Sequence, residues 1–217
     1  MDWENPLRSI AATVDADVLR ALAGAQEPVT GNQLAHLAGR SYAQVYAVAG
    51  RLVDDGMVRC VRYGRTKTYR LNRDHVLSPI IDRMLAAPAR IESEIRQAGL
   101  AWQPAAATIA FAGPAARRLV APGGAVDILI VRADAVHERD PAWRTQVAEL
   151  TRRVEEMSGN PVQLIETDRM GLRTAIHDDQ PGSGSLAQGV RTLVGEDPRR
   201  VIASAGDRER RIGEGTL

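Results

Sequence analysis

Residues 30–71 read TGNQLAHLAGRSYAQVYAVAGRLVDDGMVRCVRYGRTKTYRL, and this stretch decides the fold of the first third of the chain. Thr30 and Ser41 each precede apolar residues at helical spacing, and both are residue types that cap helix N-termini. Gly39 and Gly56 stand where the two helices end, because glycine tolerates the left-handed conformation at a helix terminus. The sequence therefore predicts two short helices separated by a tight turn.

Two strands joined by a basic turn are expected next. Residues 57–61 and 67–71 alternate as strands do, and Gly64 suits the turn between them. Every charged side chain in residues 57–73 is a cation, and a run of one sign needs either solvent or an anion. Beside two helices, we interpret this hairpin as a nucleic-acid-binding element. Its cations are Arg59, Arg62, Arg65, Lys67, Arg70 and Arg73.

The motifs of this stretch are Gln33-Leu34-Ala35, Gly39-Arg40-Ser41, residues 52–58, Tyr63-Gly64-Arg65 and Tyr69-Arg70-Leu71. Together they resemble the winged helix-turn-helix of bacterial transcriptional regulators of the ArsR and MarR kind. The resemblance implies that the second helix enters the major groove of double-stranded DNA and that the hairpin forms the wing. The cysteine pair of the arsenic sensors is absent, so no metal sensing is predicted.

The resemblance also names the residues of a DNA interface. Gln44 would read an adenine edge through both atoms of its amide, and Arg40 would reach a guanine or a phosphate. Wing residues would lie against phosphates or in the minor groove. For Tyr42, and likewise for Tyr46, packing in a half-buried position is as consistent with the sequence as a contact with DNA. The expected interface comprises Arg40, Ser41, Tyr42, Gln44 and Val45 on the second helix, with Arg62, Arg65 and Lys67 on the wing.

Helices are also expected on both sides of this stretch. Residues 15–22 have helical spacing, with Asp15 or Asp17 as the cap. Residues 76–98 predict a connecting helix that breaks at Pro88. Its apolar stripe either packs back on the winged helix or pairs with a second copy, because regulators of this class usually bind DNA as dimers.

The second half of the chain predicts an α/β domain. Strand-like runs at 108–112, 126–131 and 162–165 surround a helix at 141–158. A short apolar run, Leu186, Val190, Leu193 and Val194, predicts a closing helix. The expected organisation is an α+β chain with a winged helix over 1–75, a connecting helix and linker over 76–106, a second domain over 107–196 and a flexible tail over 197–217.

The turn Gly113-Pro114-Ala115-Ala116-Arg117-Arg118 after the first of these strands, with Asp127 on the second, resembles the nucleotidyltransferase fold of the DNA polymerase beta superfamily. That family holds two metal ions with three carboxylates, two of them flanking one residue on the second strand. Here Ala125 and Gln163 stand at two of the three positions, and one carboxylate cannot hold two metals. We therefore expect a degenerate, non-catalytic domain whose residual nucleotide site comprises Gly113, Arg117 and Asp127.

Composition limits the function further. The 217 residues carry a formal net charge of +1, so a nucleic-acid site must be a local patch of cations. The single cysteine, Cys60, has no partner for a disulfide and no neighbours for a metal site, and no motif predicts a bound cofactor. No apolar run is long enough to span a membrane, and no secretory signal is evident, so we expect a cytoplasmic protein.

Three functional hypotheses follow from these patterns. The main one is a homodimeric transcriptional regulator whose second domain serves dimerisation or binds a nucleotide, another ligand or a protein partner. The second is a divergent nucleotidyltransferase that uses the winged helix to find its substrate. The third is the antitoxin of a toxin–antitoxin pair, in which the second domain masks the toxin.

Overall fold

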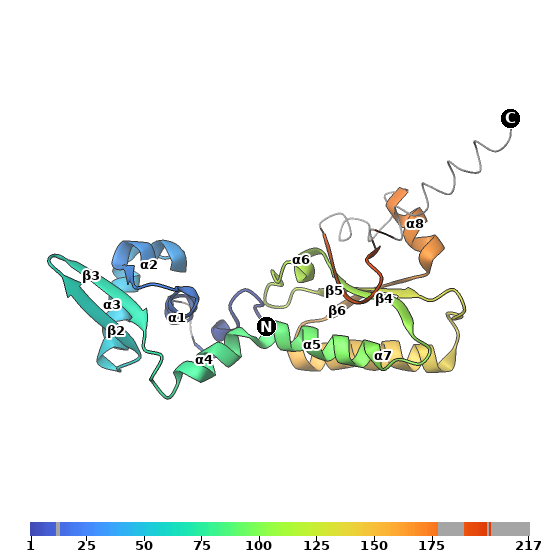
Figure 1. Cartoon of the computed structure of the whole chain (residues 1–217), viewed down its shortest axis with the longest axis horizontal. Helices are drawn as coiled ribbons and strands as arrows, with labels where there is room; N and C mark the ends of the chain where they lie inside the picture. Colours follow the sequence, from blue (N-terminus) through green and yellow to red (C-terminus); the bar gives the residue numbers. More distant parts are fainter. Residues whose placement is uncertain (12–13, 178–188, 199, 201–217) are drawn as a thin grey trace. The chain divides into compact units, whose positions relative to one another are not determined.

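The computed structural model describes residues 1–11, 14–177, 189–198 and 200, and they form an α+β protein (Figure 1). The chain divides into two compact units, one over residues 2–88 and one over residues 89–217 together with Met1. Apart from 197, 198 and 200, the expected tail lies outside the described residues, as does Leu186 of the expected closing helix.

The N-terminal unit contains the predicted helix–turn–helix and hairpin. Its sheet has the order β1-β3-β2, with antiparallel pairing throughout. The two-residue strand β1 is too short to show a sequence pattern. The elements are a 3-10 helix η1 (Pro6–Ser9), α1 (Val14–Gly24), β1 (Val29–Thr30), α2 (Gly31–Ala38), α3 (Tyr42–Asp54), β2 (Val58–Tyr63), β3 (Thr66–Leu71) and α4 (Ser78–Leu85).

One apolar core holds this unit together. Leu22 of α1, Leu34 of α2 and Leu52 of α3 are all buried in it. Tyr69 of β3 lies in the same core, and so does Ile81 of α4. The helix after the wing therefore packs back on the winged helix, which was one of the two arrangements expected from its apolar stripe.

The register of the hairpin determines which side chains face the helices. Val58 pairs with Leu71, Cys60 with Tyr69 and Arg62 with Lys67. Because side chains alternate along a strand, these three pairs lie on the same face of the hairpin. The first two pairs pack against the core of the N-terminal unit. The third pair lies nearer the tip of the hairpin on the same face and consists of two cations.

The C-terminal unit is a four-stranded sheet with helices on both faces. The strand order is β6-β5-β4-β7; β4 is antiparallel to both its neighbours, and β5 is parallel to β6. The elements are α5 (Ala87–Leu100), β4 (Ala106–Ala112), α6 (Gly113–Ala116), β5 (Val126–Arg132), α7 (Pro141–Ser158), β6 (Val162–Thr167), α8 (Arg169–His177) and β7 (Val190–Gly195).

Both faces of this sheet are apolar, which explains the continuous hydrophobic runs of β4 and β5. On one face Leu172 of α8 packs with Ala110, Leu129 and Val131. On the other face lie α5 and α7 (Figure 1). Gly99 lets α5 approach closely, because a Cβ there would lie 2.5 Å from Ile109.

Several element predictions need correction. The closing helix is wrong, because residues 190–195 form β7 on β4, and a short apolar run does not distinguish a strand from a helix. The connecting helix is interrupted, as expected, but at Ala86 and not at Pro88. Its second part runs to Leu100, so the expected linker is shorter. The linker region is also packed, since Trp102 is buried and meets Trp143 edge-to-face at 5.3 Å between ring centroids.

Candidate nucleic-acid interface

The start of α3 is held by a reciprocal cap. The Ser41 Oγ accepts a hydrogen bond from the backbone N–H of Gln44 at 3.4 Å. In return, the Gln44 Oε1 accepts from the Ser41 N–H at 3.3 Å and lies 2.9 Å from its hydroxyl. This capping box satisfies N–H groups that have no partner within the helix. The amide oxygen of Gln44, predicted to read an adenine, is therefore already engaged within the protein.

Arg40 precedes this cap and is tied to the core. Its Nε lies 2.7 Å from Oδ2 of Asp17, a side chain that is fully buried. Asp17 was expected as a helix cap, but α1 begins upstream of it at Val14, so the carboxylate lies inside the helix. Arg8 and Asn5 also donate to Asp17, at 2.6 and 2.9 Å.

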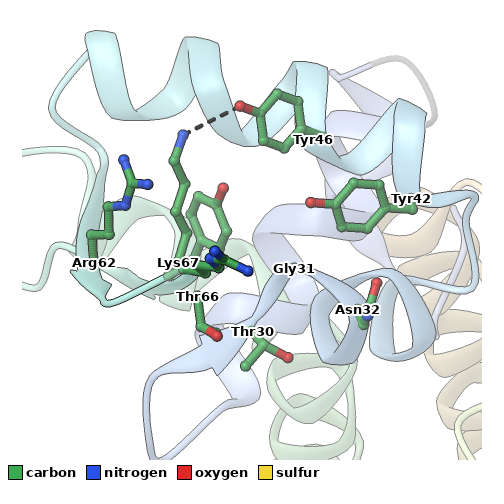
Figure 2. Close-up of a pocket in the computed structure, with 10 residues that line it drawn as sticks. Thr30, Gly31, Asn32, Tyr42, Tyr46, Arg62, Thr66 and Lys67 are labelled. Atoms are coloured by element: carbon green, nitrogen blue, oxygen red, sulfur yellow. Dashed lines mark hydrogen bonds between the residues drawn. The ribbon is translucent and has the colours of Figure 1, made fainter.

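A hollow of about 460 Å³ lies between the start of α2, the outer face of α3 and the wing (Figure 2). Tyr42 and Tyr46 line it from α3, with their rings stacked at 5.9 Å, and they are 51% and 46% exposed. Arg62 and Lys67 line it from the wing. The exposed face of the second helix and the cations of the wing thus share one concave surface.

Lys67 connects the wing to α3. Its Nζ lies 3.2 Å from the Tyr46 hydroxyl and 5.2 Å from the centre of the same ring, as Figure 2 shows for the hydrogen bond. The hydrogen bond to Tyr46 raises the pKa of Lys67 above its ordinary value, so the amine stays charged. Arg62 stands directly opposite Lys67 across the hairpin and hydrogen-bonds the carbonyl oxygen of Gly64 at 2.9 Å.

The six cations of the hairpin region fall into two groups. Arg59 is paired with Asp74 at 2.5 Å, and Arg73 with Asp82 at 2.8 Å. The other cations have no carboxylate partner among the described residues, and they are Arg62, Arg65, Lys67 and Arg70. The three wing residues predicted from the sequence thus belong to the unpaired group.

Val45 must be removed from the predicted interface. It is 1% exposed and packs in the core of the N-terminal unit, so its side chain cannot meet a base. The exposed face of α3 carries Tyr46 instead, which follows Tyr42 by one helical turn. The spacing of four residues was visible in the sequence and identifies the outward face of α3.

The predicted nucleotide site lies at one corner of the C-terminal sheet. Gly113 begins α6 with a φ of +52°, and Arg117 follows its end. Phe111 at the end of β4 pairs with Ile128, which brings the neighbouring Asp127 close to this turn. Asp127 stands beside Gln163 on the parallel strand, where the third carboxylate of the family would be.

Sequence reasoning missed an arginine cluster around Glu92 of α5. The Glu92 carboxylate accepts hydrogen bonds from Arg118 at 3.0 Å, Arg191 at 2.5 Å and Arg96 at 3.2 Å. Burial raises the pKa of Glu92, but these hydrogen bonds and charges outweigh it and hold the pKa below its ordinary value. Arg191 lies 99 positions from Glu92 in the sequence, so no local sequence pattern indicates the cluster.

Two further findings concern the described residues. They contain no group of three His, Cys, Asp or Glu side chains placed to hold a metal ion. They also contain no helix that is long and apolar enough to cross a membrane.

The fold and the interface define the N-terminal unit as a winged helix-turn-helix, the reading module of DNA-binding transcriptional regulators. Residues 12–72 match the model of a family described as sugar-specific transcriptional regulator TrmB. The expectation of a DNA-binding regulator is confirmed by this match, although the family differs from the ArsR and MarR kinds expected. No curated protein and no solved structure matches the chain, so the nucleotidyltransferase resemblance stays a prediction.

Proposed function

We propose that the chain regulates transcription as a cytoplasmic homodimer that reads a partly palindromic operator. In each copy α3 lies in the major groove and the wing rests on the DNA backbone. Tyr42, Gln44 and Tyr46 face the bases or the sugars, while Arg62, Arg65 and Lys67 contact phosphates. Arg40 and Ser41 position α3 from its N-terminal end.

The pairing of Arg62 with Lys67 carries this proposal. Like charges directly opposite each other on a hairpin are destabilising. No described carboxylate neutralises either of them, although the neighbouring Arg59 has such a partner in Asp74. An arrangement that costs stability and faces an open hollow beside α3 is suited to an external polyanion. Double-stranded DNA supplies one phosphate charge for about every 1.7 Å of helix axis.

For the C-terminal unit we propose a non-catalytic role in dimerisation or in binding a ligand or a protein partner. The support is the position of Asp127 beside Gln163, since a two-metal mechanism needs further carboxylates on this part of the sheet. A residual nucleotide site at Gly113, Arg117 and Asp127 remains part of the proposal. Its test is equilibrium binding of nucleotides with and without Mg²⁺.

The DNA-binding proposal is tested by removing the unpaired cations of the wing. We expect Arg62→Ala with Arg65→Ala to weaken operator binding and to lower the slope of log K against log salt by about 2, at about 0.9 per phosphate contact. The matched control is Arg59→Ala with Arg83→Ala, which removes the same charge from the same unit. Equal affinity and slope for wild type and the wing variant would overturn the proposed role of the wing.

A further inference from the structure

Strand β6 forms one edge of the C-terminal sheet, and no described residue pairs with its outer side. The carbonyl oxygen of Pro161 accepts a hydrogen bond from Val126 on the inner side, at 2.8 Å. Because backbone direction alternates along a strand, the polar groups of Val162, Leu164 and Glu166 point outward. An edge of this kind is a template for another strand unless it is blocked.

Only one of these outward N–H groups has a partner among the described residues. The Val162 N–H donates to Oε1 of Glu155 in α7, at 3.0 Å. The N–H groups of Leu164 and Glu166 remain available along the edge. The strand is six residues long and carries neither a lysine nor an internal proline, the residues that commonly protect such edges.

A shallow groove of about 420 Å³ runs beside this edge, between β6 and α7. Leu164 lines it from the strand, and Val147, Ala148 and Thr151 line it from the helix. Of the charged residues on α7 that line the groove, Arg144 lies toward one end and Arg152 and Glu155 toward the other, and Glu166 lines it from β6. The middle, at Ala148 and Thr151, is small and uncharged. Arg152 is paired with Glu156 at 2.6 Å, so Arg144 at one end and Glu155 at the other are the charges of α7 that can meet a second copy.

A two-fold axis through Leu164 would satisfy both the edge and the groove. The two Leu164 residues would exchange backbone hydrogen bonds, and each Val162 would face the other copy's Glu166, so no like charges would meet on the strands. The α7 helices would run antiparallel across the axis. Arg144 of each copy would then approach Glu155 of the other, with the small residues Ala148 and Thr151 between them.

We propose that two copies of this chain join through β6 and α7 to form a continuous eight-stranded sheet. Such an interface is isologous, with the same patch used by both partners. The proposal deepens the proposed function, because two C-terminal units joined in this way supply the two reading heads that a palindromic operator requires. It does not depend on DNA binding, since the dimer would form without an operator.

Sedimentation velocity of the full chain without DNA tests the dimer over a range from micromolar to hundred-micromolar protein. We expect a dimer, and we expect Leu164→Lys to weaken it by about tenfold or more, because two ammonium groups would meet at the axis. Met170→Lys is the matched control, since Met170 is an exposed apolar residue of the same unit. The control should dimerise like the wild type.

A charge exchange identifies the contact itself. Arg144→Glu and Glu155→Arg should each weaken the dimer, and the double variant should restore much of the loss. The two residues are eleven positions apart on α7, or about 16 Å, and cannot meet within one chain. If the double variant regains dimer affinity, the two residues must therefore meet between copies. The hydrogen bond of Glu155 to the Val162 N–H within one chain would not produce such a rescue.

The proposal is overturned by a wild-type chain that stays monomeric throughout, or by a dimer that Leu164→Lys leaves unchanged. A dimer that appears only when residues 201–217 are removed would also overturn it, since that segment would then be the occupant of the edge. Because these results are obtained without DNA, they are distinguishable from a failure of the wing variant to lose operator affinity.

Discussion

Arg40 places its guanidinium 2.7 Å from the fully buried carboxylate of Asp17, and so joins the turn before α3 to the first turn of α1. Arg8 contributes a second cation to the same carboxylate, from η1 at the start of the chain. The angle at which α3 leaves the core is thus fixed by a buried ion cluster. We infer that Arg40 positions α3, and that direct contact with a base is left to residues further along the helix.

Removal of the carboxylate should destabilise the protein strongly. Asp17→Ala removes the buried carboxylate that Arg8 and Arg40 share, and breaking a buried pair costs about 3–5 kcal/mol. The loss should lie toward the lower end of this range, because both arginine side chains are about a third exposed and Arg8 keeps its ion pair with Asp2. Asp15→Ala is the control in the same helix, because Asp15 pairs with Arg51 at the surface, where an ion pair contributes about 0–1 kcal/mol. Urea unfolding followed by circular dichroism measures both. Equal losses of unfolding free energy in the two variants would show that the Asp17 cluster stabilises the protein no more than the surface ion pair of Asp15.

The same carboxylate predicts a particular acid response. Burial raises the pKa of Asp17, but hydrogen bonds from Arg40 and Arg8 outweigh it and hold the pKa below its ordinary value. The contribution of this carboxylate to stability is therefore fully present above the ordinary aspartate pKa of about 3.9 and is lost as pH falls through the lower folded value.

Unfolding free energies across this acid range, compared between wild type and Asp17→Asn, measure the effect. The wild type should lose more stability than the variant as the pH falls. Curves that stay parallel would assign the acid loss to other groups.

The elements that the sequence predicted well are those with local signals. The capping residues Thr30 and Ser41 and the stop at Gly39 lie within a few positions of what they control, so α2 and α3 begin and end as expected. Asp17 was mistaken for a cap because its partner Arg40 lies 23 positions away. The strand β7 was mistaken for a helix because its pairing with β4 is a long-range contact that a short apolar run does not reveal.

The site was predictable to a similar degree. The unpaired cations Arg62, Arg65 and Lys67 were selected from the six cations of the hairpin region by the winged-helix resemblance, which places them on the wing around the turn at Gly64. Their relation to Tyr46 required the register, because only the pairing of Cys60 with Tyr69 shows which face of the hairpin turns toward α3. The dimer interface that we propose for the C-terminal unit depends on the strand order, which short strand-like runs do not specify.

Substitutions of Gln44 can separate its proposed contact with a DNA base from its role in the capping box of α3. Gln44→Glu keeps an acceptor at the third helical position, where glutamate also completes a capping box, so thermal stability should change little. The variant loses the amide donor and adds a negative charge, and it should bind the operator at least about tenfold more weakly.

Gln44→Ala, in contrast, should lose the reading group and the reciprocal half of the capping box, in which the Ser41 N–H donates to Gln44. The Ser41 Oγ still accepts from the backbone N–H of residue 44, so the stability loss should lie toward the lower end of the roughly 0.5–2 kcal/mol that removal of a whole N-cap costs. Thermal melts and fluorescence anisotropy distinguish the two variants. Unchanged operator affinity in Gln44→Glu would remove this residue from the DNA interface.

Lys67→Glu should make the protein more stable and a poorer DNA binder. The substitution replaces two cations that stand opposite each other by an ion pair with Arg62. It also places a carboxylate where a phosphate is expected. Arg70→Glu makes the same charge change on the opposite face of the strand, and it should weaken DNA binding less. A stabilised variant with full operator affinity would mean that this face of the wing does not meet DNA.

The most direct test of the account is a titration of the purified chain against upstream genomic fragments and random-sequence DNA, repeated at two salt concentrations. We predict tight binding to one upstream fragment, at least about a thousandfold tighter than to random DNA, with a steep salt dependence that the Arg62→Ala and Arg65→Ala substitutions reduce. Weak binding without preference for any fragment would contradict the account and make the winged helix a protein-docking module.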